Sequence, residues 1–168
     1  MTARSFLPAI LAACLLALSP LAGHAAPRPV LSGHTSQGQV VDLAALRGKV
    51  VMLLFWSTDC AVCLDKLPEL RRNLAGWRGK DFVVIAVNQD QMARDLAAYE
   101  QVLDAVVAPD PQMKIVWRRD PQHHDAFGDL PLREPHTVVI DRGGEIAKSV
   151  HGRFPSELWD DVAELLLN

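Results

Sequence analysis

Cys60 and Cys63 are the residues whose types and spacing most clearly suggest chemistry. They lie three positions apart in the segment 56–70, WSTDCAVCLDKLPEL. Two thiols at this spacing can form a disulfide with each other and release it again, which makes them a two-electron switch. The same spacing also occurs in haem attachment, in half of a zinc site and in structural disulfides, so these alternatives have to be weighed.

The residues around the pair disfavour three of these alternatives. A c-type haem needs a histidine directly after the second cysteine, and Leu64 stands there. A closed zinc site needs four ligands, and the sequence has no second pair of cysteines. A structural disulfide across two intervening residues closes so short a loop that little chain entropy is gained. Redox chemistry is therefore the favoured interpretation.

One metal-binding alternative stays open. Cys60, Cys63 and a nearby histidine would form a Cu(I)-binding module, because the soft Cu(I) ion suits thiolate ligands. His123 and His124 are adjacent, with an aspartate after them. Adjacent histidines point in different directions on most backbones, so for this stretch we expect an exposed polar loop and no metal site.

The N-terminus has the pattern of a secretory signal peptide. A positive residue, Arg4, precedes an apolar run at 6–18, and small residues follow it. The run is shorter than the roughly 20 residues that a permanent membrane helix needs. We expect cleavage after Ala25, with cleavage one residue later as the near alternative. The signal is then residues 1–25, and the mature chain, 26–168, is a single periplasmic domain without stable membrane insertion.

Cys14 lies in a Leu-Ala-Ala-Cys run that resembles a lipoprotein box, and lipidation there would anchor the protein to a membrane. The apolar run continues past Cys14, so we expect a residue that is discarded with the signal. Cys60 and Cys63 are then the only thiols of an exported protein in an oxidising compartment. Each has only the other as an intramolecular partner.

The sequence around the cysteines also predicts the elements that position them. Residues 50–56, VVMLLFW, are typical of a strand that is buried on both faces. From Cys60 to Trp77 the apolar residues recur at helical spacing, and Pro68 inside this helix removes a hydrogen bond. Cys60 thus lies at a helix N-terminus, where the macrodipole and free N–H groups stabilise a thiolate. We expect Cys60 to be the attacking sulfur and Cys63 to resolve the mixed disulfide.

The rest of the chain alternates between predicted strands and helices. We expect strands at 39–42, 82–87, 105–108 and 137–141, a hairpin partner at 145–150, and helices at 91–102 and 155–167. Residues 113–118 favour one or two helical turns, and residues 27–38 an irregular lead-in. This order predicts an α/β fold with a mixed sheet. The formal net charge of −3 gives no sign of nucleic-acid binding.

The segment 55–63, FWSTDCAVC, with Pro68 five residues after the second cysteine, resembles the active-site segment of thioredoxin-fold proteins. With the export signal and the segment 135–144, PHTVVIDRGG, the chain is similar to the TlpA/ResA-like branch of periplasmic thiol–disulfide oxidoreductases. The resemblance implies a thioredoxin-like fold, with a central mixed sheet flanked by helices and a short N-terminal extension. It also implies a redox-active Cys60–Cys63 disulfide, no other cofactor and no metal.

The resemblance further implies an activity and partners. Reduced Cys60 would attack disulfides of other exported proteins, and Cys63 would release the product. Electrons would come from a membrane thiol reductase of the DsbD/CcdA type, and apocytochrome c would be one client. A dithiol oxidase of exported proteins is the alternative enzyme.

By the same resemblance, Pro135 is the family's cis-proline, packed against the two cysteines. Its cis bond would expose the backbone of Glu134 to a client peptide and would keep metals away from the thiols. From the residues alone Pro131 is an equal candidate, and the resemblance favours Pro135, because its spacing to Ile140-Asp141 matches the family.

Several residues near the motif are candidates for tuning the thiol pKa. A nearby Glu134 carboxylate would raise it, and a protonated His136 would lower it. Trp56 and Lys66 are further candidates because they flank the cysteines. Lys66 also stands where many relatives have a glutamate, and Leu54 stands where thioredoxins carry a buried aspartate. Both departures remove acids that would assist proton transfer at the buried sulfur.

Overall fold

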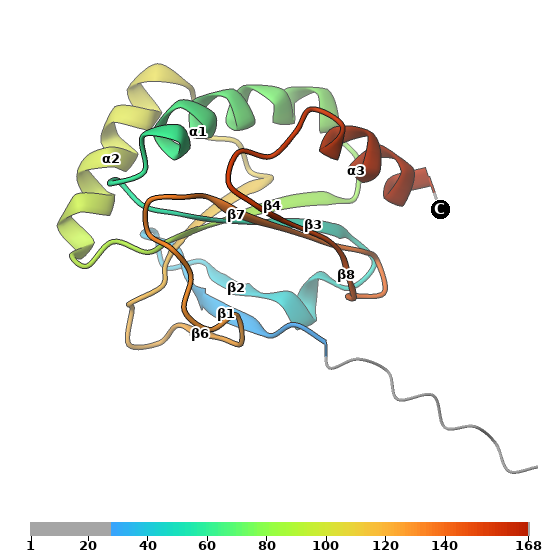
Figure 1. Ribbon diagram of the computed structural model, residues 1–168, viewed down its shortest axis with the longest axis horizontal. Helices are drawn as coiled ribbons and strands as arrows, with labels where there is room; N and C mark the ends of the chain where they lie inside the picture. Colours follow the sequence, from blue (N-terminus) through green and yellow to red (C-terminus); the bar gives the residue numbers. More distant parts are fainter. Residues whose placement is uncertain (1–27, 168) are drawn as a thin grey trace, which may run out of the picture.

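The computed structural model describes residues 28–167, and Figure 1 shows their arrangement. The signal peptide predicted at 1–25, its cleavage site and Cys14 lie outside the described residues. Between residues 28 and 167 no helix combines the length and the apolar character that crossing a membrane requires.

A five-stranded mixed sheet forms the centre of the fold, as the sequence predicts, with the order β5-β4-β3-β7-β8. The parallel strands are β3 (Val50–Trp56), β4 (Phe82–Asn88) and β5 (Met113–Trp117). The antiparallel strands are β7 (His136–Ile140), next to β3, and β8 (Ile146–His151), next to β7. Every residue of β3 and β4 is buried, because both faces of the sheet are covered.

Helices cover one face of this sheet and a smaller sheet covers the other (Figure 1). The helical layer consists of α1 (Ala61–Asn73), the 3₁₀ helix η2 (Leu74–Trp77), α2 (Ala93–Val106) and α3 (Leu158–Leu167). The smaller sheet, with the order β2-β1-β6, consists of β1 (Leu31–His34), β2 (Val40–Asp42) and β6 (His124–Asp125). A 3₁₀ helix, η1 (Leu43–Leu46), follows β2.

Alternation along β3 divides its side chains between two apolar cores. Leu54 and Trp56 pack in the core under the helices, which also contains both cysteines. Leu53 and Phe55 pack in the core against the smaller sheet. The direction in which a strand residue points therefore decides whether it lies on the cysteines' side of the sheet.

The observed elements differ from the predicted ones at the end of α2, at β5 and at β1. Residues 105–108 are not a strand, because α2 continues through Val106 and buries Leu96 and Leu103 at helical spacing. The third parallel strand is β5, where the sequence favours helical turns, and it pairs in register with β4. Residues 31–34 of the expected irregular lead-in form β1, which pairs with both β2 and β6.

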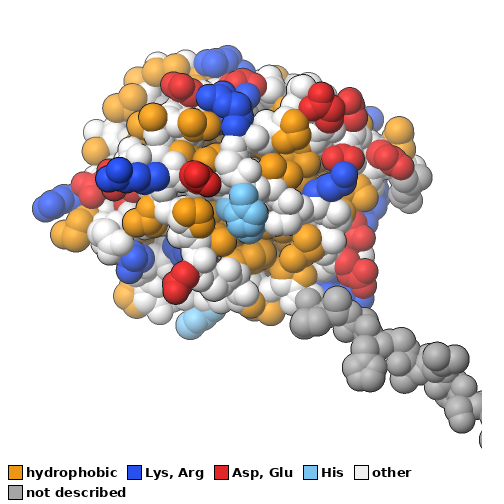
Figure 2. All heavy atoms as spheres, viewed as in Figure 1, with side chains coloured by type: hydrophobic (Ala, Val, Ile, Leu, Met, Phe, Trp, Pro, Cys, Tyr) orange, Lys and Arg blue, Asp and Glu red, His pale blue; other side chains and the backbone are white. Residues whose placement is uncertain are grey.

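The surface mixes charges of both signs. Figure 2 shows acidic and basic side chains interspersed over the face that is seen in Figure 1. This distribution fits the small formal net charge of −3.

Candidate redox site

Cys60 and Cys63 form a disulfide at the start of α1. Cys60 is the N-cap of this helix, and its carbonyl oxygen accepts hydrogen bonds from the N–H groups of Cys63 and Leu64, at 2.9 and 3.1 Å. The Cys60 Sγ also accepts a hydrogen bond from the Cys63 N–H, at 3.1 Å. The sulfur of Cys60 therefore lies where free N–H groups and the macrodipole favour negative charge.

Both cysteines are fully buried in the disulfide form. They share the core under the helices with Leu67 and Phe154. Trp56, which we expect to influence the thiol pKa, lies in the same core and packs against Tyr99 with ring centroids 5.1 Å apart. A client cannot touch either sulfur in this form unless the residues around the disulfide move.

The turn at 57–59, which joins β3 to Cys60, is held by Asp90, a residue that the sequence analysis missed. The Asp90 carboxylate accepts hydrogen bonds from the Thr58 N–H at 2.8 Å and from the Asn88 side-chain amide at 2.9 Å. The main-chain carbonyl oxygen of Asp90 accepts a third hydrogen bond, from the Trp117 indole N–H at 2.8 Å. The available signal is the polar run Asn-Gln-Asp directly after a buried strand, because the carboxyl ends of parallel strands meet at one edge of a sheet.

The segment before β7 lies beside the same turn. The Ser57 hydroxyl donates a hydrogen bond to the carbonyl oxygen of Leu132. The Ser57 carbonyl oxygen in turn accepts one from the Cys60 N–H, at 3.2 Å. His136, the first residue of β7, pairs with the penultimate residue of β3. Pro135 therefore lies near the carboxyl end of β3, which is the end that leads to the cysteines.

The predicted cis bond before Pro135 is wrong for this structure. Residues 28–167 contain no cis peptide bond, so Glu134–Pro135 is trans. The trans form of an X–Pro bond is favoured by about 0.5–1 kcal/mol, and Pro135 leads directly into an extended strand, not into a tight turn that would require cis. Pro135 is buried and its carbonyl oxygen accepts a hydrogen bond from the Gly152 N–H at 2.8 Å, whereas Glu134 is exposed. That these two residues bind a client stays a prediction.

His136 does not lie where a modulator of the Cys60 pKa would have to lie. It is paired with Phe55 and stacks on that ring, so its side chain points into the core away from the helices. Burial and the neighbouring His151, whose ring lies 4.0 Å away, lower the pKa of His136 and favour the neutral imidazole. The expectation of a positive charge beside Cys60 is therefore wrong, because strand alternation turns His136 to the opposite face.

Lys66, the other charged candidate, lies on α1 one turn after Cys63. Its Nζ forms an ion pair with Glu69 at 2.8 Å and lies 5.3 Å from the centre of the Phe154 ring. Phe154 packs in the same core as the disulfide. An influence of Lys66 on the thiol pKa stays a prediction.

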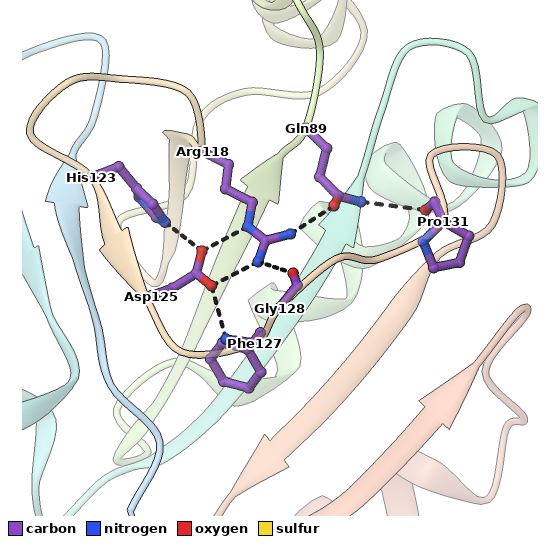
Figure 3. A network of polar contacts seen from close by, with 7 residues as sticks. All are labelled: Gln89, Arg118, His123, Asp125, Phe127, Gly128 and Pro131. Carbon is purple, nitrogen blue, oxygen red and sulfur yellow. Dashed lines mark hydrogen bonds and ion pairs between the residues drawn. The ribbon is translucent and has the colours of Figure 1, made fainter.

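Residues 122–125 are only in part the exposed loop that the sequence predicts: Gln122 and His124 are exposed, but residues 124–125 form β6 and the side chains of His123 and Asp125 are buried. The side chains of His123 and Asp125 are 2% and 4% exposed, and they are 2.9 Å apart. Arg118 donates two further hydrogen bonds to Asp125, both at 2.7 Å (Figure 3). Burial by itself would raise the Asp125 pKa, but bonds from His123, Arg118 and the Phe127 N–H hold it well below its usual range.

Among residues 28–167 no group of three or more His, Cys, Asp or Glu side chains is placed to hold a metal ion. The Cu(I) module built from both cysteines and a histidine stays the alternative prediction. In this structure the cysteines are joined to each other.

Taken together, a CxxC disulfide at the N-terminus of the helix that follows the central strand of a mixed sheet defines a thioredoxin-fold redox protein. The family model described as AhpC/TSA matches residues 22–149, and the chain belongs to this family.

Curated relatives and solved structures agree with this assignment. The chain is 26% identical to the thiol-disulfide oxidoreductase ResA of Halalkalibacterium halodurans over 132 residues, which cover 77% of this chain and 69% of the relative. It is 27% identical to ResA of Bacillus subtilis over 144 residues, covering 86% and 75%. A solution structure from Bacteroides thetaiotaomicron, provisionally assigned as a protein disulfide isomerase, matches with a TM-score of 0.65 and 26% identity over 84% of this chain and 88% of that one.

A provisionally assigned thiol:disulfide interchange protein DsbE from Chlorobium tepidum has the same sequence identity to this chain. Its crystal structure matches with a TM-score of 0.60 and 26% identity, covering 83% of this chain and 92% of that one. The thioredoxin-like fold predicted from the sequence is confirmed by these likenesses.

Proposed function

We propose that this protein is an exported thiol–disulfide oxidoreductase that reduces disulfides in other exported proteins. The observation that carries the proposal is the Cys60–Cys63 disulfide with Cys60 as the N-cap of α1. The names of the ResA relatives, which are thiol-disulfide oxidoreductases, support the reaction class. The predicted signal peptide supports export to the periplasm.

The reaction proceeds in two exchange steps. The Cys60 thiolate attacks one sulfur of a client disulfide, so that a mixed disulfide forms and the other client sulfur leaves as a thiolate. The Cys63 thiolate then attacks the Cys60 sulfur, forms the Cys60–Cys63 disulfide and releases the second client thiolate. The client takes up two electrons and two protons, and the protein is left oxidised.

The N-terminus of α1 assists the first step. The Cys63 N–H, which donates to the Cys60 Sγ at 3.1 Å, also stabilises the Cys60 thiolate that attacks the client. A membrane thiol reductase of the DsbD/CcdA type would restore the dithiol, and apocytochrome c is one client that fits this scheme. Both partners are expectations from the family resemblance.

The direction of electron flow is tested by equilibrating the purified protein with glutathione redox buffers. We expect a reducing couple, closer to the roughly −270 mV of thioredoxin than to the roughly −120 mV of the strongest periplasmic oxidants. A value near the oxidising end would contradict a reductase and favour the dithiol oxidase. Metal analysis of protein purified without added metal supplies the second readout, and tightly bound copper would contradict both enzymes.

A further inference from the structure

The first residue after each parallel strand carries a side-chain hydrogen-bond donor. Ser57 follows β3, Gln89 follows β4 and Arg118 follows β5. The strand ends are in register, because Trp56 pairs with Asn88 and Asn88 with Trp117. The three donors therefore stand side by side along the carboxyl edge of the sheet, and the first of them lies three residues before Cys60.

All three donors bind backbone carbonyl oxygens of one short segment, residues 128–132, which we call the strap. The bonds run from Ser57 to Leu132, from Gln89 to Pro131 at 3.4 Å, and from Arg118 to Gly128 at 2.6 Å. Figure 3 shows the last two, with the donors reaching from the strand ends to the strap. The strap has neither helix nor strand structure of its own, so these bonds decide where it lies.

Arg118, which binds the strap at Gly128, is itself held in place by several hydrogen bonds. Asp125 accepts two bonds from the Arg118 guanidinium, and the Gln89 side-chain oxygen accepts a third at 3.0 Å. Asp125 is held in turn by His123, which packs so closely on β1 that a Cβ at Gly33 would lie 2.8 Å from its Nδ1. The long bond from Gln89 to Pro131 is the weakest of the three anchors by its geometry.

A pocket lies between the donors and the strap. Its volume is about 230 Å³, and it is lined by Gln89, Arg118 and Arg119 on one side and by residues of the strap on the other. The strap therefore borders an opening, and of its side chains Leu130 packs against the core on the side of the smaller sheet. Such a segment is released by the loss of a few hydrogen bonds.

We infer that Ser57, Gln89 and Arg118 are positioning residues of the disulfide exchange, which hold the strap beside the turn 57–59 that leads to Cys60. The inference rests on the proposed function and on the burial of both sulfurs, since a mixed disulfide cannot form until a buried Cys60 is uncovered. Ser57 links the strap to the motif directly, because it donates to Leu132 and accepts from the Cys60 N–H. Release of the strap is the step that admits a reaction partner.

The test measures access separately from redox equilibrium. Oxidised protein is reduced with dithiothreitol, and reduced protein is oxidised with 2-hydroxyethyl disulfide. The change in tryptophan fluorescence, to which Trp56 in the same core as the disulfide contributes, follows both reactions. We expect Gln89→Leu and Ser57→Ala each to raise both rates by about twofold to tenfold, since one neutral hydrogen bond contributes modestly. The equilibrium with glutathione should stay unchanged, because a barrier that the strap raises slows the forward and the reverse reaction alike.

Arg119→Met is the matched control, since Arg119 lines the same pocket but is exposed and does not tie the strap. It should leave both rates unchanged. The inference is overturned if the two variants react at the wild-type rates, or if they shift the glutathione equilibrium and leave the rates as they were. These small-molecule rates do not depend on any client, so a failure of the proposed function is seen separately, in the measured potential. Thermal melting of each variant confirms that it is folded.

Discussion

The Asp90 carboxylate accepts a hydrogen bond from the Thr58 N–H at 2.8 Å and so joins the loop after β4 to the turn that carries Cys60. Asp90 is only 6% exposed, and its second carboxylate oxygen is bound by the Asn88 amide. The chain lacks the acid that thioredoxins carry in the strand before the motif. It instead has a buried carboxylate in a neighbouring loop, where it fixes the backbone ahead of the nucleophile.

Asp90→Ala should lower the free energy of unfolding by about 1–3 kcal/mol, because it leaves the half-buried Thr58 N–H and the buried Asn88 amide without their acceptor. Asp90→Asn keeps one acceptor oxygen and should cost less. Urea denaturation of the oxidised protein measures both. The exposed Asp81 provides a control, and equal midpoints for Asp90→Ala and Asp81→Ala would contradict the role given to Asp90.

Cys60 should be the first thiol to be alkylated in the reduced protein, because it lies at the N-terminus of α1. Cys63→Ala should accumulate mixed disulfides with clients, and Cys60→Ala should accumulate none. Peptide mapping after a short pulse of iodoacetamide at neutral pH gives the order of modification. Faster labelling of Cys63 would reverse the assignment of the two roles.

The stability of the fold should depend on pH through His136. Its pKa in the folded protein is lowered by burial and by His151, whereas an unperturbed histidine titrates near about 6.5. The unfolded chain therefore binds the proton at a higher pH than the folded chain does. The free energy of unfolding should be highest above about pH 6.5 and should fall as the pH drops toward the folded-state pKa.

His136→Phe tests this dependence, because phenylalanine retains an aromatic ring against Phe55 and carries no proton. Chemical denaturation at a series of pH values should give a flatter profile for the variant between about pH 7 and pH 5. The exposed His124, changed to glutamine, is the matched control and should retain the wild-type slope. Parallel profiles for wild type and His136→Phe would show that another group is responsible.

Gly33→Ala should destabilise the fold by about 1–3 kcal/mol, the usual range for overpacking. The added Cβ would lie 2.8 Å from the His123 ring, which is itself fixed by Asp125 and has no room to retreat. Gly76→Ala is the control, because a Cβ there meets nothing within 4 Å. Melting temperatures of the two variants decide the matter, and an unchanged value for Gly33→Ala would mean that the His123 packing is loose.

The elements around the cysteines were predictable because each has a clear pattern of apolar residues. Residues 50–56 are buried on both faces and are apolar throughout, and α1 repeats its apolar residues at helical spacing. Strands β5 and β1 were not predictable in the same way. β5 is buried at some positions and half-exposed at others, and β1, Leu-Ser-Gly-His, has little strand propensity and depends on its partners.

The polar contacts around the site could not be predicted from local sequence patterns, because they join residues from different strands. Arg118, Asp125 and Gln89 meet only because β4, β5 and β6 converge in space, and no spacing in the sequence encodes that. The face on which His136 lies depends on its register with β3. Because side chains alternate between the two faces of a strand, His136 lies on the same face of β7 as Val138 and Ile140. Only the pairing of β7 with β3 shows that this face points away from the cysteines.

The three ties on residues 128–132 all end on carbonyl oxygens, which every amino acid supplies. The side chains of that stretch therefore contribute nothing to these anchors. Gly128, whose φ of 65° favours glycine, and Leu130, which packs against the core, should be kept, whereas residues 129, 131 and 132 are open to diversification without loss of attachment. Substitution at these three positions is accordingly the way to look for a change in client preference without rebuilding the redox centre.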